Sequence, residues 1–308
     1  MNILCARPRL IGLVCGAAAV AMGMAYLQLA GAPPRYLLVN FAALVLGATA
    51  WLALGRAGGE RLSRAGVATL ALSAPLLVTA LFGVVVDGAS RWVNIGPLGV
   101  QVSLIVLPVM ILLYARRPDA IGTAGMVVAA AALAIQPDRA MAGVLLASLA
   151  ALLVAAPGRL ALLAAAAATL AFGWTLLVPD NLPASPFVDR VFHTAFDVHA
   201  LAGTAVLVGA AALLVPAILG GLSGGAGRPA ILAFGACWAA VLLAAVLDNY
   251  PTPLVGYGGS AVLGYLLSVA LLPDAGRRTG AAGAGDSAVP VQPGSDQGIA
   301  ELRAAGAA

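Results

Sequence analysis

Long apolar runs constrain the fold of this chain more than any other feature, because about 17 to 25 apolar residues are enough to cross a bilayer as a helix. About ten such runs follow one another, separated by short polar connections. They cover residues 10–30, 36–54, 67–86, 100–115, 120–135, 140–156, 160–178, 199–219, 230–247 and 260–272. The pattern predicts an all-α, polytopic transmembrane helix bundle.

Composition excludes an ordinary soluble domain. Hydrophobic residues make up 62% of the chain and charged residues 9%, whereas soluble domains carry about 25% charged residues. The run 10–30 is longer than the apolar core of about 7 to 15 residues in a signal peptide, so we expect an uncleaved first helix. Cys5, Cys15 and Cys237 are far apart in the sequence, which argues against a disulfide framework or a zinc site.

The arginines predict the orientation of the bundle, because cytoplasmic loops carry the excess of basic residues. All 16 basic residues are arginine. With the N-terminus inside, twelve lie in cytoplasmic segments and four lie outside, namely Arg35, Arg91, Arg139 and Arg190. An even number of spans places the C-terminus in the cytoplasm too. There residues 275–308 predict a disordered tail beyond a membrane domain of residues 1–274, and nothing in this charge pattern indicates a nucleic-acid partner.

Four connections on the predicted outer side are rich in polar and glycine residues: 87–103, 136–139, 179–203 and 248–260. Each has a local explanation. Arg91 and Trp92 suit a membrane-interface anchor, Asp138 suits a helix N-cap, and the glycines at 256–259 suit a turn. These local explanations do not account for all four lying on one side of the membrane.

The stretch 179–203 contains both histidines of the chain. If it is helical from Val188 onward, Asp189, His193 and Asp197 recur at every fourth residue and share one face. They are weak candidates for a metal site, because they provide too few ligands. The alternative for His193 and His199 is an interfacial position with satisfied hydrogen bonds.

The four connections carry motifs in an order that resembles one protein family. Residues 88–103, GASRWVNIGPLGVQVS, are similar to G-A-x-R-W-[IVL]-x-x-G-x-x-x-Q-P-S-E, and residues 136–140, QPDRA, to Q-P-D-L-G-T. Residues 251–267, PTPLVGYGGSAVLGYLL, are similar to P-L-P-F-V-S-Y-G-G-S-S-x-L-x-x-x-L, and residues 188–203, VDRVFHTAFDVHALAG, to T-D-F-I-F-A-V-I-G-E-E-L-G-F-L-G. Over roughly residues 10–272 the chain thus resembles the SEDS family, the RodA, FtsW and SpoVE type of shape, elongation, division and sporulation membrane proteins.

The chain is a shortened and divergent match to this pattern. Leu104 stands where Q-P-S-E has its acidic residue, Val188 stands where a threonine precedes the aspartate, and Gly256 replaces a serine. The segment G-S-G-x-x-G-x-G, which opens the large outer loop in the family, is absent. These departures affect the expected activity more than the expected fold.

The resemblance implies a peptidoglycan glycosyltransferase of the bacterial cytoplasmic membrane, which polymerises lipid II at the outer face and works with a class B penicillin-binding protein among the membrane lipids. Asp189 matches the family's aspartate and would be the general base of an inverting transfer. Positive charge for the leaving diphosphate would come from Arg91, Arg139 and Arg190, with a divalent cation, Mg²⁺ or Mn²⁺, as another source. The other substrate-binding candidates are Trp92, Gln101, Ser103, Asp138, Tyr257, Gly258, Gly259 and Ser260.

Two other functions stay open. The leucine at position 104 and the shortened outer loop favour a catalytically degenerate SEDS-like scaffold that binds lipid II or a penicillin-binding protein. The number of spans would also suit a lipid or solute transporter, although the sequence shows no inverted repeat.

Overall fold

The computed structural model describes residues 7–56, 64–180, 182–222, 227–247 and 249–273, so the predicted tail lies outside the described residues. Six helices of this part are long and apolar enough to cross a membrane: α1 (Pro8–Leu29), α2 (Pro34–Arg56), α4 (Ala65–Phe82), α8 (Arg159–Leu177), α12 (Arg228–Leu247), and α10 (Ala200–Ala212) with α11 (Val215–Leu222) as one span. Four shorter apolar helices accompany them: α5 (Val102–Arg116), α6 (Ala120–Ile135), α7 (Arg139–Ala155) and α13 (Gly259–Ala270). The polytopic helical bundle is therefore confirmed.

The predicted run 199–219 is divided into two helices. Helix α10 ends at Ala212 and α11 begins at Val215. Pro216 lies in the first turn of α11, where proline is tolerated, whereas continuing α10 through it would lose one helical hydrogen bond and crowd the preceding turn. The break therefore has a local sequence cause.

The helix in the stretch 179–203 begins later than expected. Helix α9 covers Val191–Val198, and Arg190 precedes it with a left-handed backbone at φ 59°. Asp189 lies before the helix and pairs with Pro251 in an isolated β-bridge. The prediction that Asp189, His193 and Asp197 share one helical face is therefore wrong.

Residues 84–101 fold into a small antiparallel sheet that the apolar runs did not predict. Its strands β1 (Val84–Val86), β2 (Ala89–Ile95) and β3 (Leu98–Gln101) are adjacent in sequence order. Asp87 and Gly88, with φ of 45° and 85°, form the first turn, and Gly96, with φ 59°, begins the second. Such positive angles suit the two-residue turns that match the twist of paired strands. The register pairs Trp92 with Gln101 and brings two motif residues side by side.

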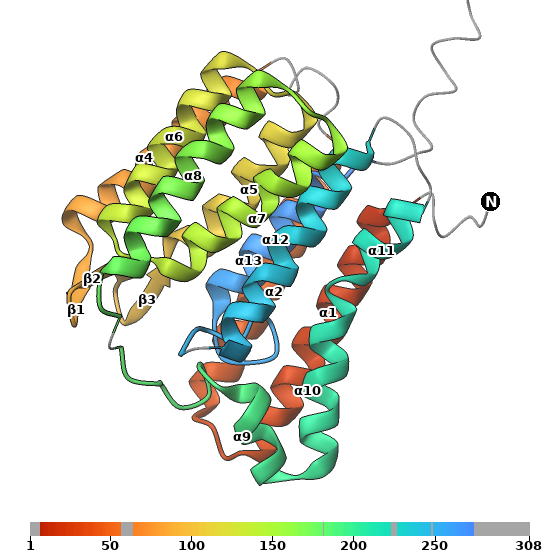
Figure 1. The fold of residues 1–308 in the computed structure, drawn as a ribbon. Coiled ribbons are helices and arrows are strands. Elements are labelled where there is room, and N and C mark those ends of the chain that lie inside the picture. Colours follow the sequence, from red (N-terminus) through yellow and green to blue (C-terminus); the bar gives the residue numbers. More distant parts are fainter. Residues whose placement is uncertain (1–6, 57–63, 181, 223–226, 248, 274–308) are drawn as a thin grey trace, which may run out of the picture. The chain divides into compact units, whose positions relative to one another are not determined.

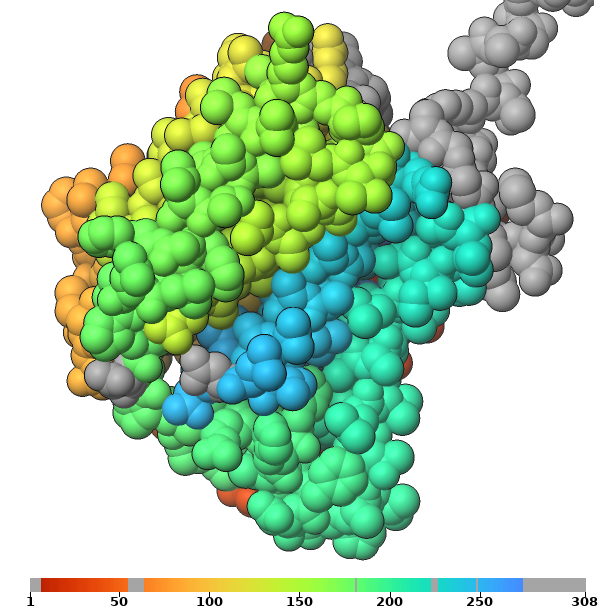
Figure 2. All heavy atoms as spheres, viewed as in Figure 1, coloured from red at the N-terminus to blue at the C-terminus, as the bar shows by residue number. Residues whose placement is uncertain are grey.

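Helix α5 holds a central position, because α4, α7, α12 and α13 all pack against it. Helices α4, α6 and α8 form one flank of the bundle, and α1, α10 and α11 form the other (Figure 1). On the face shown in Figure 2, the blue atoms of the C-terminal helices lie between these flanks. The sheet and α9 lie at the same end of the bundle (Figure 1), as expected for connections on one side of a membrane.

Small residues bring the helix backbones close together. A Cβ atom added at Gly12 of α1 would lie 2.7 Å from the Val269 side chain of α13. At Gly16, one turn later, it would lie 2.8 Å from Tyr265. Close approach of this kind increases van der Waals contact where lipid provides no hydrophobic drive.

The tightest approach predicts a large effect of one methyl group. A Cβ at Gly264 would lie 1.9 Å from the Leu104 carbonyl oxygen, so Gly264→Ala must separate α13 from α5. We expect the free energy of unfolding to fall by about 2 kcal/mol, measured by thermal unfolding of the purified protein in detergent. Gly173→Ala in α8 is the control, because nothing lies within 4 Å of its added Cβ. Equal losses in both variants would contradict the close contact.

Candidate functional site

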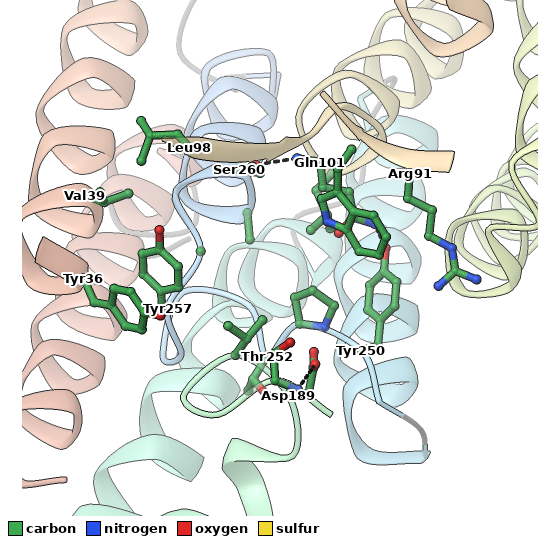
Figure 3. A pocket seen from close by; sticks show the side chains of 18 of the residues that line it. Tyr36, Val39, Arg91, Leu98, Gln101, Asp189, Tyr250, Thr252, Tyr257 and Ser260 are labelled. Carbon is green, nitrogen blue, oxygen red and sulfur yellow. Dashed lines mark hydrogen bonds between the residues drawn. The ribbon is translucent and has the colours of Figure 1, made fainter. Parts of the chain in front are cut away.

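A cavity of about 700 Å³ lies at the end of the bundle that carries the sheet. Residues from α2, β2, β3 and the segments 182–189 and 249–261 line it. Its polar lining comprises Arg35, Tyr36, Arg91, Trp92, Gln101, Ser185, Asp189, Asn249, Tyr250, Thr252, Tyr257 and Ser260 (Figure 3). The size is in the range of ordinary ligand sites.

Backbone hydrogen bonds join two of the four outer connections around this cavity. The Thr252 amide donates to the Val188 carbonyl at 2.9 Å, and the Tyr257 amide donates to the Phe187 carbonyl at 2.7 Å. Together with the bridge between Asp189 and Pro251, they pair the segment before α9 with the segment before α13. The position of Asp189 is thus set by backbone pairing and does not depend on a helix.

Gln101 links the other connections. Its Nε2 donates to the Tyr250 hydroxyl at 2.8 Å and more weakly to Asp138 Oδ2 at 3.4 Å. Its backbone amide donates to Ser260 Oγ at 3.1 Å. Ser103 Oγ donates to the same Asp138 Oδ2 at 2.9 Å. One glutamine therefore fixes the sheet against the 136–139 turn and against both ends of the 249–260 segment.

Tyr250 is a neutral phenol in this network. Burial raises its pKa well above the ordinary value, and the negative charge of Asp138 adds to the effect. A neutral hydroxyl can both accept and donate, so Tyr250 can accept from Gln101 and still donate toward the cavity that it lines.

Arg91 is buried, with 3% of its side chain exposed, and it is already engaged by protein groups. Its Nη2 donates to the Pro137 carbonyl and to Asp180 Oδ2, both at 2.5 Å. Burial alone would lower the pKa of Arg91, but the charges of Asp138 and Asp180 outweigh it and raise the pKa. Figure 3 shows the guanidinium turned away from Tyr36 and Tyr257.

The opposite wall is built by α2. Tyr36 and Tyr257 stack with ring centres 3.7 Å apart, and the Arg35 guanidinium carbon lies 5.4 Å from the Tyr36 ring centre. Buried Asn40 donates to the Gly256 carbonyl at 2.9 Å and accepts from the Gly258 amide at 3.1 Å, which holds Tyr257 in place. Motif matching missed Arg35, Tyr36 and Asn40; the available signal was Arg35 at the outer start of the second apolar run.

Three residues that line the cavity each have a buried polar atom without a protein partner. Thr252 Oγ1, Gln101 Oε1 and Arg91 Nε have no hydrogen-bond partner among the described residues. Each belongs to a side chain with at most 3% exposure that lines the cavity. Because a buried polar group without a partner costs about 1–3 kcal/mol, such a cluster is typical of a site that gains partners on binding.

The structure brings only part of the predicted site together. Asp189, Arg91, Trp92, Gln101, Tyr257, Gly258 and Ser260 line the cavity. Ser103, Asp138, Arg139, Arg190 and Gly259 are not among the residues that line it. Asp138 and Ser103 are buried and hydrogen-bonded. Arg139 donates to the Val178 carbonyl at 3.1 Å, and Arg190 is exposed.

The residues proposed as weak metal ligands are not assembled. His193 and Asp197 are exposed on α9, while Asp189 lies outside that helix and its Oδ2 accepts from the Ser185 amide at 2.8 Å. In the described part of the chain, no three His, Cys, Asp or Glu side chains gather as a metal site.

The double role of Asp138 gives a test of the network. Asp138 and Asp119 are both N-caps, accepting from the Met141 and Gly122 amides. Asp119→Ala should cost about 1 kcal/mol of unfolding free energy, the usual loss of a cap. Asp138→Ala should cost roughly 3 kcal/mol or more, because it also leaves buried Ser103 and Gln101 with fewer partners. Chemical unfolding of the two purified variants measures the difference, and equal losses would show that the network adds no stability.

Comparison with known proteins was made by sequence and by structure. No protein-family model and no curated protein matches the chain. The rod shape determining protein RodA of Thermus thermophilus superposes with a TM-score of 0.62 and 25% identity, over 85% of this chain and 94% of RodA. An aspartate-to-alanine mutant of that RodA superposes with a TM-score of 0.61 and 23% identity, over 85% of this chain and 95% of the mutant. A chain from a peptidoglycan synthase complex that coordinates polymerization and crosslinking superposes with a TM-score of 0.60 and 21% identity, over 85% of this chain and 95% of that chain. The chain therefore has the polytopic helical fold of RodA, and with it the fold of the SEDS family that its motifs resemble.

Proposed function

We propose that this chain is a multi-pass glycosyltransferase of the bacterial cytoplasmic membrane that polymerises lipid II at the outer face. The single observation that carries the proposal is the cavity in which Asp189 of one motif meets Arg91 and Gln101 of another, both of which have an unpartnered buried polar atom. The SEDS-like fold supports the same substrate class, because one structurally similar chain belongs to a peptidoglycan synthase complex.

In the proposed reaction Asp189 is the general base. It accepts the proton of an acceptor sugar hydroxyl while that oxygen bonds to the anomeric carbon of the donor and the bond from this carbon to the diphosphate oxygen breaks, with inversion. The hydrogen bond from the Ser185 amide to Oδ2 orients the carboxylate, and the bridge to Pro251 fixes its backbone. A positioned base of this kind contributes about 10²–10⁴-fold to rate.

Arg35 is our candidate for binding the leaving diphosphate. It lines the cavity, its side chain is exposed, and no carboxylate pairs with it among the described residues. Arg91, by contrast, is held by Asp180 and Pro137, so its charge acts mainly through the field in the cavity. The stacked Tyr36 and Tyr257 rings offer an apolar face beside Arg35 on which a sugar ring can lie.

We propose a class B penicillin-binding protein as the partner. The structurally similar chain of the peptidoglycan synthase complex is described as taking part in coordinated polymerization and crosslinking. A transpeptidase partner would supply the crosslinking activity, because the site proposed here performs polymerisation alone.

A non-catalytic scaffold is the second candidate, and one observation favours it. Leu104 lines the cavity and is 2% exposed, at the position where the family motif has an acidic residue. A site without that acid would still bind a lipid-linked sugar through Gln101, Ser260 and the tyrosines, but Asp189 would be the one carboxylate among its described lining residues.

The role of Asp189 is tested by one near-isosteric change. We expect Asp189→Asn to lower polymerisation of labelled lipid II by at least about 100-fold, because the amide cannot accept the proton. Asp87→Asn is the control, since Asp87 is exposed in the hairpin turn away from the cavity lining and asparagine also suits that turn. Wild-type protein that binds lipid II and the partner without polymerising it, alone or with the partner, would favour the scaffold instead.

Substitution of Arg35 and of Arg190, the two exposed outer arginines, should have different effects on activity. Arg35→Gln should lower kcat/KM for lipid II by at least about tenfold, because a charge-assisted hydrogen bond contributes about 1.5–3 kcal/mol and 1.36 kcal/mol corresponds to tenfold. Arg190→Gln removes the same charge from a side chain outside the cavity lining, so its loss should be smaller. A larger loss of kcat/KM in Arg190→Gln than in Arg35→Gln would contradict this assignment and indicate that the diphosphate binds near Arg190, as the sequence motif suggested.

A further inference from the structure

A second hollow, of about 620 Å³, lies along α5 and reaches the end of this helix that is farther from the sheet. Helix α5 forms its floor and packs against both α4 and α13, which form its walls. Apart from Arg64 the lining is apolar, and several of its side chains are spaced one helical turn apart: Ala68 and Leu72 of α4, Val109 and Leu113 of α5, Leu267 of α13 and Leu271 just after it. The hollow is therefore a groove that runs along the helices.

The length of this groove matches one leaflet of a membrane. Its α5 floor extends from Ile105 to Leu113, which is about 12 Å at 1.5 Å per residue. Half of a hydrocarbon core of about 30 Å is roughly 15 Å. The lining side chains are mostly half-buried, so the groove is open along one side to whatever surrounds the bundle. An extended acyl chain has the shape and polarity that fit it.

A positive charge lies at one end of the groove. Arg64, which precedes the first turn of α4, is exposed and is the one charged residue among the described lining residues. Arg116 lies at the same end and donates to the carbonyl of Leu271, itself a lining residue, at 3.1 Å. The arginine distribution predicts that this end faces the cytoplasm, where basic pockets between helices bind anionic headgroups.

We propose that the groove binds one anionic phospholipid of the cytoplasmic leaflet. One acyl chain lies along α5 between α4 and α13, and the phosphate contacts Arg64. A zwitterionic lipid has the same phosphate but carries its own ammonium group, which offsets the attraction to Arg64, so the site favours headgroups with a net negative charge. This site is independent of the proposed glycosyltransferase activity.

Native mass spectrometry of the purified full chain in detergent tests the headgroup contact. The probes are dioleoyl phosphatidylglycerol and dioleoyl phosphatidylcholine, which have identical acyl chains. We expect the first lipid bound to prefer phosphatidylglycerol about fivefold, the effect of one arginine near a membrane surface. Arg64→Gln should abolish this preference. Arg117→Gln, also exposed and at the end of α5 but outside the groove lining, should keep it.

A second matched pair tests the acyl contact. Ala68→Phe should fill the groove and lower binding of both lipids, whereas Ala71→Phe, exposed on the same helix outside the lining, should not. The proposal is overturned if the wild type binds both lipids equally, if Arg117→Gln matches Arg64→Gln, or if Ala68→Phe binds like the wild type. Displacement of the lipid by glycerol 3-phosphate would also overturn it, because binding would then need no acyl chain. Thermal unfolding confirms that each variant is folded.

Discussion

The buried carboxylate of Asp138 organises the end of the bundle that holds the cavity. A charged group away from water must be hydrogen-bonded and compensated. Asp138 caps α7 with one oxygen and accepts from Ser103 and Gln101 with the other, while the charge of Arg91 balances it. Because these partners come from different segments, satisfying one carboxylate holds the sheet and the start of α5 against the 136–139 turn, and Gln101 extends the arrangement to Tyr250 of the C-terminal connection.

The helices were predictable because an apolar segment that crosses a membrane must satisfy its own backbone hydrogen bonds, and a helix does so within one segment. The sheet was not predicted, because Val84–Val86 continued the apolar run of the preceding span. The signal lay in Asp87 and Gly88, a pair that favours a two-residue hairpin turn. Asp189 was placed on a helix because local spacing contains no information about Pro251, its backbone partner sixty-two positions later in the chain.

The motifs located the segments of the site better than its side chains. Gln101, Asp189 and Ser260 line the cavity as expected, whereas Arg139 and Arg190 lie outside its lining although they follow motif residues directly. Which neighbour turns inward depends on strand register and helix start, which distant contacts decide. The sequence indicated that Arg35 is on the outer side, but its place in the site depends on the stacking of Tyr36 on Tyr257, which joins parts of the chain far apart in sequence.

The four short helices affect how far below the lipid headgroups the end of the bundle can lie. Helix α13 has 12 residues and rises only about 18 Å, well short of a hydrocarbon core of about 30 Å. Where such helices end, the bilayer must thin or the protein must form a recess below the headgroups. A buried charge in that recess is poorly screened by mobile ions, so the field of Arg91, which is 3% exposed, has little sensitivity to the ionic strength outside.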